Sequence, residues 1–224
     1  MVRIQDDKLH RTFREILPSL WLCWELVLLG EPVAVFSPSP TQGSDAVLAL
    51  STIILPVSFH LIFSKRKTVP WADAPISLQI QYSGDVRPYF TVQDSDYKEF
   101  TTKTKPASNV IIGVTNPYFV KALEHWPHMI SLGSTKKSSP SKRTSSLDIP
   151  QGANTKYDPY MRPDKKILKK LDETADVASC EEILEQHFVE LTQSFLLPLE
   201  RYFQMLVPSG RSAICFFIFL SRFL

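Results

Sequence analysis

The chain has 224 residues, of which 44% are hydrophobic and 21% charged, and its formal net charge is +2. This composition is typical of a globular protein with one sizeable domain or two small ones. A near-neutral chain lacks the concentrated basic face that nucleic-acid binding needs, so no nucleic-acid partner is expected. The seven glycines lie more than ten residues apart, which excludes both glycine-rich phosphate-binding loops.

Cysteine usage and hydropathy predict a cytosolic protein without a membrane span. The three cysteines, Cys23, Cys180 and Cys215, are odd in number and far apart, so they predict neither a disulfide framework nor a zinc site. Residues 1–14 are charged and polar, unlike a signal peptide. The most apolar run, 214–220, has seven residues, whereas a membrane span needs about 20.

The chain begins with a pattern of helix followed by strand. Apolar residues recur near the 3.6-residue period over 3–29, which predicts one or two helices. Pro18 is expected to break or kink this segment, and Gly30 is expected to end it. The short apolar segment 32–37 is typical of a strand that is buried on both faces.

A second helix and an irregular stretch are predicted next. Ser44 can cap a helix over 45–53, because its hydroxyl can accept a hydrogen bond from a free N–H group in the first turn. Residues of about 51–75 combine an apolar run, a basic cluster and several prolines. No steady period survives there, so we expect an irregular insertion.

The middle of the chain returns to an alternation of strands and helices. Strands are predicted over 89–92, 110–114 and 129–132 from their short runs of β-branched, aromatic and other apolar residues. Asn116 is expected to cap a helix over 117–125, which has proline at its first position. This order of elements predicts an α/β fold with a parallel or mixed sheet.

The last third of the chain begins with a polar segment and ends in helices. Residues 134–154 hold many Ser, Thr, Lys and Arg residues and little apolar surface, so they predict a disordered linker. This linker could also be a phosphorylated or anion-binding segment. A short basic helix is expected over 163–172. A long helix with one broad apolar face is expected over 180–206, with a kink at Pro198.

Few side chains are arranged as a catalytic or metal-binding set. No nucleophile, base and orienting group occur together, and no serine elbow is present, so no catalytic residue is assigned. His125 and His128 could share a helix face, but an intervening proline breaks that helix, so no metal site is expected. Asp94 and Asp96 could line a ligand crevice of a small-molecule enzyme or could cap their own turn.

Aromatic residues make up 11% of the chain. Most are expected in the core, but a few could form a surface for a protein partner, because aromatic anchors dominate binding at interfaces. The candidates are Trp21, Trp24, Tyr89, Phe90, Tyr118, Phe119, Trp126, Phe195, Tyr202 and Phe203.

Three long stretches carry a family resemblance. They are Leu22–Pro40, Asp85–Thr102 and Val110–Gly133, and they contain the motifs WELVLLGEP, RPYFT, GVTNP and HWPH. Each resembles the central region of the DENN domain family. Residues 157–159 and Phe188–Tyr202 are similar to the helical part that follows in that family. The resemblance implies an α/β fold with a DENN-type parallel or mixed sheet, flanking helices and a helical segment after them.

The resemblance also divides the chain. Residues 1–133 would form a partial DENN α/β lobe with the irregular insertion of about 51–75, where the family runs almost directly from helix to strand. The Ser/Lys linker over 134–154 would lead to a helical segment over 155–207 and an unmatched apolar tail over 208–224. Most of the longin-like N-terminal lobe of the family is expected to be absent.

Membership of the DENN family would imply a guanine-nucleotide exchange factor for a Rab-type small GTPase in endosomal membrane traffic. Such a factor moves the switch loops of its partner so that GDP leaves, and it needs no cofactor or metal of its own. It would be cytoplasmic and peripheral on recycling endosomes. A binding-only module that keeps the GTPase surface without exchange is the alternative. The resemblance points to partner contacts at Arg87, Tyr89, Asp94 and Asp96.

Overall fold

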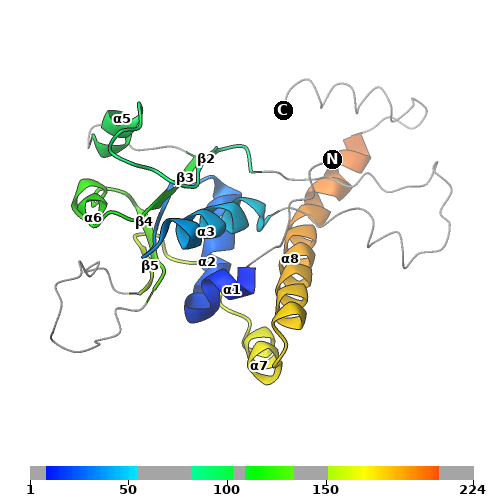
Figure 1. Ribbon diagram of the computed structural model, residues 1–224. Helices are drawn as coiled ribbons and strands as arrows, with labels where there is room; N and C mark the ends of the chain where they lie inside the picture. Colours follow the sequence, from blue (N-terminus) through cyan, green and yellow to red (C-terminus); the bar gives the residue numbers. More distant parts are fainter. Residues whose placement is uncertain (1–8, 55–81, 103–108, 134–150, 207–224) are drawn as a thin grey trace, which may run out of the picture.

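The computed structural model describes residues 9–54, 82–102, 109–133 and 151–206, in which a central sheet lies between two layers of helices (Figure 1). The predicted insertion of about 51–75 lies outside the described residues apart from 51–54, and the predicted tail 208–224 lies wholly outside them. No helix in the described ranges combines the length and the apolar character that a membrane span requires.

The sheet has five strands in the order β2–β3–β1–β4–β5. Strand β1 pairs in parallel with β3 and β4, and β2 extends the parallel part beyond β3. Strand β5 closes the other edge antiparallel to β4. The predicted α/β fold with a mixed sheet is therefore confirmed. The strands are β1 Val33–Phe36, β2 Asp85–Arg87, β3 Val110–Val114, β4 His128–Ser131 and β5 Gly152–Thr155.

Helices cover both faces of this sheet, which explains why β1 and β3 carry no polar side chain and are buried at every position. Alternate residues of β1 enter different cores: Val33 and Val35 face one cluster, and Ala34 and Phe36 face the other. The larger cluster includes α1, α2, α3, α7 and α8, whereas the smaller one includes α6 and packs against α5. The helices are α1 Leu9–Phe13, α2 Leu20–Leu29, α3 Pro40–Thr52, α5 Tyr97–Thr101, α6 Tyr118–Ala122, α7 Lys165–Glu173 and α8 Val177–Leu206.

The N-terminal helical prediction is confirmed with its break. Helix α1 is followed by a 3-10 helix over Arg14–Ser19 that contains Pro18, and then by α2. Ile16 leaves the helical region of backbone dihedrals within this link. Gly30 ends α2 in the left-handed conformation, with φ of 69°, and its N–H donates to the carbonyl groups of the last turn.

The predicted cap of the next helix is wrong. Helix α3 begins at Pro40, and Ser39 is its cap, because the Ser39 hydroxyl accepts a hydrogen bond from the Gln42 N–H at 3.3 Å. A serine followed by proline is the better start, since proline has no N–H to satisfy and its φ is already helical. The Ser44 hydroxyl instead donates to the Pro88 carbonyl at 3.2 Å.

The predicted strand over 89–92 is also wrong. Strand β2 lies earlier, over Asp85–Arg87, and Pro88 ends it because proline has no N–H group to continue the ladder. The chain then crosses the end of β3, where the Phe90 N–H donates to the Gly113 carbonyl at 2.7 Å. Of the apolar residues that suggested a strand, only Phe90 is buried, with its side chain 2% exposed.

The C-terminal third differs from its prediction at three boundaries. Strand β5 includes the last three residues of the range 134–154, which are therefore not a disordered linker; residues 134–150 lie outside the described residues. Helix α7 begins after Asp164, whose carboxylate accepts the Lys166 N–H, and not at Pro163. Helix α8 begins at Val177, because Asp176 accepts the Ser179 N–H at 3.0 Å.

Two indole N–H groups join α8 to α2. Trp21 donates to His187 Nε2 at 3.1 Å, and Trp24 donates to the Thr192 hydroxyl at 2.9 Å. Phe188 packs between these contacts with its ring 5.6 Å from that of Trp21. Because an indole nitrogen can only donate, Nε2 of His187 must carry no proton when this bond is made.

The His187 contact predicts that acid weakens the fold. Burial lowers the pKa of His187, against smaller raising effects of Asp164 and Glu190. The unfolded chain therefore takes up a proton near the ordinary pKa of about 6.5, while the folded chain still resists it, so stability falls as the pH drops below that value. Urea unfolding at pH 7.5 and 5.5 measures this loss. His187→Gln keeps an acceptor without titrating, and an unchanged pH dependence in this variant would contradict the assignment.

Candidate functional site

The candidate site lies where the parallel strands β2 and β3 end. Residues 88–96 leave β2 and lead into α5, and the end of β3 leads into α6. In parallel sheets this carboxyl edge is where ligands and partners usually bind, because the loops there are free of the ladder. The site therefore consists of the loop after β2 and the first turns of α5 and α6.

The loop after β2 is held close to the sheet by its backbone. A Cβ atom on Gly113 would lie only 2.3 Å from the Pro88 carbonyl oxygen, so only glycine allows this approach. The side chain of Phe90 then fills the smaller core, with ring centroids 5.4 Å from Phe100 and 5.5 Å from Phe119. The close approach at Pro88 and the buried side chain of Phe90 therefore hold the loop against the sheet. The residues beside Phe90 consequently keep a defined position on the surface.

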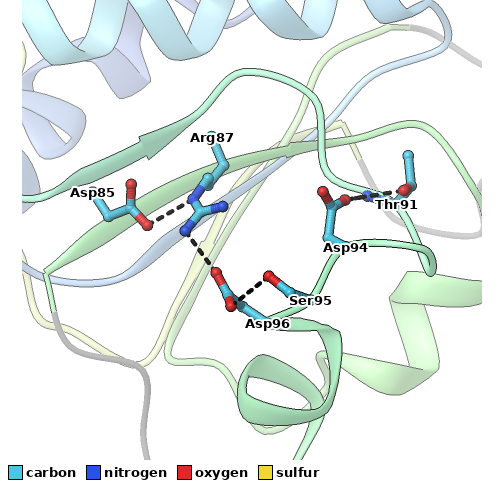
Figure 2. A network of polar contacts seen from close by, with 6 residues as sticks. All are labelled: Asp85, Arg87, Thr91, Asp94, Ser95 and Asp96. Atoms are coloured by element: carbon cyan, nitrogen blue, oxygen red, sulfur yellow. Dashed lines mark hydrogen bonds and ion pairs between the residues drawn. The ribbon is translucent and has the colours of Figure 1, made fainter.

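Arg87 is fixed between two carboxylates. Its Nε donates to Asp85 Oδ2 and its Nη2 to Asp96 Oδ2, each at 2.7 Å (Figure 2). The hydrogen bond to Asp85 is the main cause that raises the pKa of Arg87, so the guanidinium is charged. Its side chain is 36% exposed. A guanidinium has five N–H donors, so this arrangement leaves donors for an outside acceptor.

The two predicted aspartates serve different purposes. Asp94 Oδ2 accepts the Thr91 N–H at 2.6 Å and the Thr91 hydroxyl at 3.0 Å, which is the turn-capping role considered from the sequence. Asp96 pairs with Arg87 and accepts the Ser95 hydroxyl at 2.8 Å. Figure 2 shows the two carboxylates directed at these separate partners. Their use as an acid–base pair in an enzyme stays a prediction that this geometry does not favour.

Exposed aromatic side chains lie on the same loop and helices. Tyr89 is 51% exposed and Tyr118 is 54% exposed. The hydroxyl groups of Tyr97 and Tyr118 are 2.8 Å apart, and this bond is the main cause that raises the pKa of Tyr97. Asn116 Oδ1 accepts the Tyr118 N–H at 2.9 Å and so closes the turn that leads into α6, but the helix begins at Tyr118 with Pro117 as its N-cap and is shorter than the predicted 117–125. We call Arg87, Tyr89, Asp96, Tyr97 and Tyr118 the carboxyl-edge surface.

Part of this surface is predictable from the sequence alone. Arg87, Tyr89 and Asp96 were predicted as contact residues, and Tyr118 was among the aromatic candidates. Tyr97 was missed, because only the pairing of β2 with β3 brings α5 beside α6. Of the other aromatic candidates, Trp21, Trp24, Phe90, Phe119 and Trp126 are buried in the core.

His128 and the two described cysteines are buried away from the carboxyl-edge surface. His128 is buried, its Nδ1 lies 2.7 Å from the Thr155 hydroxyl, and burial lowers its pKa. Burial raises the pKa of Cys23 to about 12 and is the main cause that raises the pKa of Cys180, so neither thiol is poised as a nucleophile. Within the described ranges, no three His, Cys, Asp or Glu side chains gather as a metal ligand set.

Curated relatives match nearly all of the chain. Protein DENND6A from Mus musculus is 38% identical over 222 residues, which cover 93% of this chain, and Protein DENND6B from Homo sapiens is 38% identical over 95% of it. Protein DENND6 homolog from Dictyostelium discoideum is 34% identical, also over 95%. No family model matches the chain, and no solved structure gives a significant match.

These matches define the chain as a DENN-domain protein, and more narrowly as one that is DENND6-like. The resemblance read from the four sequence motifs is thereby confirmed. The chain spans about a third of the length of these relatives, since it covers 33% of DENND6A and 34% of DENND6B.

Proposed function

We propose that this chain contributes to guanine-nucleotide exchange on a Rab-type small GTPase, which it contacts through the carboxyl-edge surface. The similarity to DENND6 proteins over 93% of the chain is the observation that carries this proposal. Such a protein would act in endosomal membrane traffic, in the cytoplasm and peripherally on recycling endosomes. It would need no cofactor and no nucleic acid.

The geometry of the carboxyl-edge surface supports a role in binding loops of a partner protein. Tyr89 presents an exposed ring on the loop after β2, which Gly113 and Phe90 hold in place. Arg87 offers a charged donor that two carboxylates orient in advance, which reduces the entropy lost on binding. Exchange would follow if this surface binds the nucleotide-free GTPase more tightly than the GDP-bound form, and it would involve no covalent step.

Tyr89→Ala is expected to weaken GTPase binding by about ten- to thirty-fold, as loss of an aromatic anchor at an interface typically does. The side chain is half exposed, so the fold should be unaffected. Binding to nucleotide-free Rab proteins and release of fluorescent GDP measure the effect. Tyr160→Ala is the matched control, since Tyr160 is 88% exposed and lies in the segment before α7. Equal losses in both variants would contradict the proposed surface.

A binding-only module is the second candidate, because a surface that binds the GTPase releases GDP only if it prefers the nucleotide-free form. If exchange needs contacts from regions of the relatives outside this match, the chain would bind a nucleotide-free GTPase without accelerating GDP release. Both assays on the same Rab panel separate the two candidates. If the chain neither binds any Rab protein of the panel nor accelerates its GDP release, both candidate functions are rejected.

A further inference from the structure

Lysine side chains cover the outer side of α7. Between residues 160 and 171 the chain holds five basic residues and one acidic residue, a formal net charge of +4, whereas the whole chain carries +2. Four of the basic residues belong to α7, and all four side chains are exposed. At about 100° per residue they lie within roughly 140° of the helix circumference. We call Lys165, Lys166, Lys169 and Lys170 the α7 basic face.

The opposite side of α7 is already occupied by the core. Leu171 is buried, and Ile167 and Leu168 pack against the larger cluster. Figure 1 shows α7 at one end of the described structure, below α8 and away from α5 and α6. The helix therefore cannot turn its apolar side to a partner without leaving the core, and the α7 basic face is the side that a partner would meet.

The α7 basic face is unfavourable for the helix that carries it. Lys165 and Lys169 are four residues apart, and so are Lys166 and Lys170, which places like charges next to one another on the helix surface. Each such pair destabilises a helix, and the two lysines of the first turn also oppose the helix dipole. Folding alone therefore does not explain this arrangement, whereas an anionic partner would stabilise it.

Acidic side chains neutralise little of this charge. The Asp164 carboxylate accepts the Lys166 N–H at 2.8 Å as the cap of α7. Glu173 Oε1 lies 3.6 Å from Lys169 Nζ, but both side chains are largely exposed, and such a surface pair contributes little. Among the described residues, no carboxylate forms an ion pair with the other three lysines of the face.

We propose that the α7 basic face binds the surface of an anionic lipid bilayer. Lysine is a strongly hydrated point charge on a flexible stem, which suits the many loosely arranged headgroup charges of a bilayer. Protein interfaces are instead depleted in lysine and enriched in arginine and aromatic side chains, so an acidic protein is the weaker partner. Recognition of a single phosphate would need a cradle of backbone N–H groups or an arginine fork, neither of which four lysine side chains provide.

This binding would be electrostatic and reversible. Each lysine near an anionic surface strengthens binding by about fivefold, and salt screens the effect. Because α7 lies away from α5 and α6, the carboxyl-edge surface would stay accessible to a GTPase. The inference deepens the peripheral membrane association of the proposed function, but its test contains no GTPase, so the two proposals can fail separately.

Co-sedimentation of the whole chain with lipid vesicles tests this contact. Vesicles of phosphatidylcholine with about one-third phosphatidylserine are compared with phosphatidylcholine alone, at low and at high salt. Lys166→Gln combined with Lys170→Gln removes two charges of the face. Lys98→Gln combined with Lys121→Gln is the matched control, because it changes the net charge equally at exposed lysines of α5 and α6. Arginine at positions 166 and 170 keeps the charge.

We expect the chain to bind the anionic vesicles, to leave them at high salt, and to ignore the neutral ones. The glutamine pair in α7 should weaken binding by about 25-fold, whereas the control pair and the arginine pair should stay within about threefold of the unmodified chain. Urea unfolding should show the glutamine pair in α7 to be at least as stable as the unmodified chain, because one repulsive pair is lost.

Three results would overturn the proposal. Equal losses in the glutamine pair of α7 and in the control pair would mean that only the net charge of the chain matters. A chain that does not prefer anionic to neutral vesicles would leave the α7 basic face to solvent. Binding to a polyglutamate peptide or to an RNA strand in place of vesicles, lost in the same α7 variant, would assign the face to an acidic protein or to a nucleic acid.

Discussion

Phe188→Ala is expected to lower the free energy of unfolding by about 3 to 5 kcal/mol, as truncation of a fully buried aromatic side chain does. Phe188 is 2% exposed and its ring lies 5.6 Å from Trp21, between the two indole hydrogen bonds that join α8 to α2. Loss of the ring removes apolar contact and leaves a cavity at this junction. Urea unfolding followed by tryptophan fluorescence measures the change directly, because Trp21 reports on the same contact.

Phe195→Ala is the matched control for this prediction. Phe195 is on the same side of α8 but 47% exposed, so its truncation is expected to cost under about 1 kcal/mol. A large difference between the two variants would establish that the docking energy of α8 is concentrated in its amino-terminal half. Equal effects would mean that α8 does not dock on α2 through Phe188.

Gly113→Ala is expected to destabilise the protein by about 2 kcal/mol or more, because it forces extra atoms into a close-packed region. The new Cβ atom would meet the Pro88 carbonyl oxygen at 2.3 Å, and a backbone atom in this loop cannot rotate away. The loop after β2 must shift, which breaks the hydrogen bond from the Phe90 N–H. The same shift displaces Tyr89, so we also expect weaker binding of a GTPase.

The comparison with Gly43→Ala isolates the backbone clash. A Cβ atom on Gly43 would meet the Ser37 hydroxyl oxygen at 2.5 Å, and that side chain can rotate. Gly43 also lies within α3, where alanine is favoured by roughly 1 kcal/mol. Gly43→Ala should therefore cost much less than Gly113→Ala in thermal or urea unfolding. Similar losses in both would argue against a rigid loop over β3.

Local patterns predicted most of the elements but not their starts. The buried strands β1 and β3 and the stop of α2 at Gly30 follow from apolar runs and from one residue with left-handed backbone. The start of α3 was placed at the wrong serine, because Ser39 and Ser44 are both acceptable caps and only the position of Pro88 gives Ser44 another partner. The strand predicted over 89–92 failed because Phe90 is buried as a single anchor.

Strand β5 shows what local composition cannot detect. Its four residues, GANT, have little strand propensity and follow a polar stretch. They join the sheet because β4 offers a free edge, and because His128 holds Thr155 through a side-chain contact of 2.7 Å. Both conditions involve residues about 25 positions away in the chain, so they arise only after the sheet has formed.

By itself the sequence determined the α/β class, the apolar strands, the absence of a phosphate-binding glycine loop and the resemblance to the DENN family. These features depend on residue type and on the spacing of residues that are close in the sequence. Local sterics and hydrophobicity relate both directly to secondary structure. Only the tertiary structure decided that Asp94 closes a turn, that Asp96 orients Arg87, and that Tyr97 meets Tyr118. These contacts depend on strand pairing and on the close approach at Gly113, which bring together side chains that the sequence keeps apart.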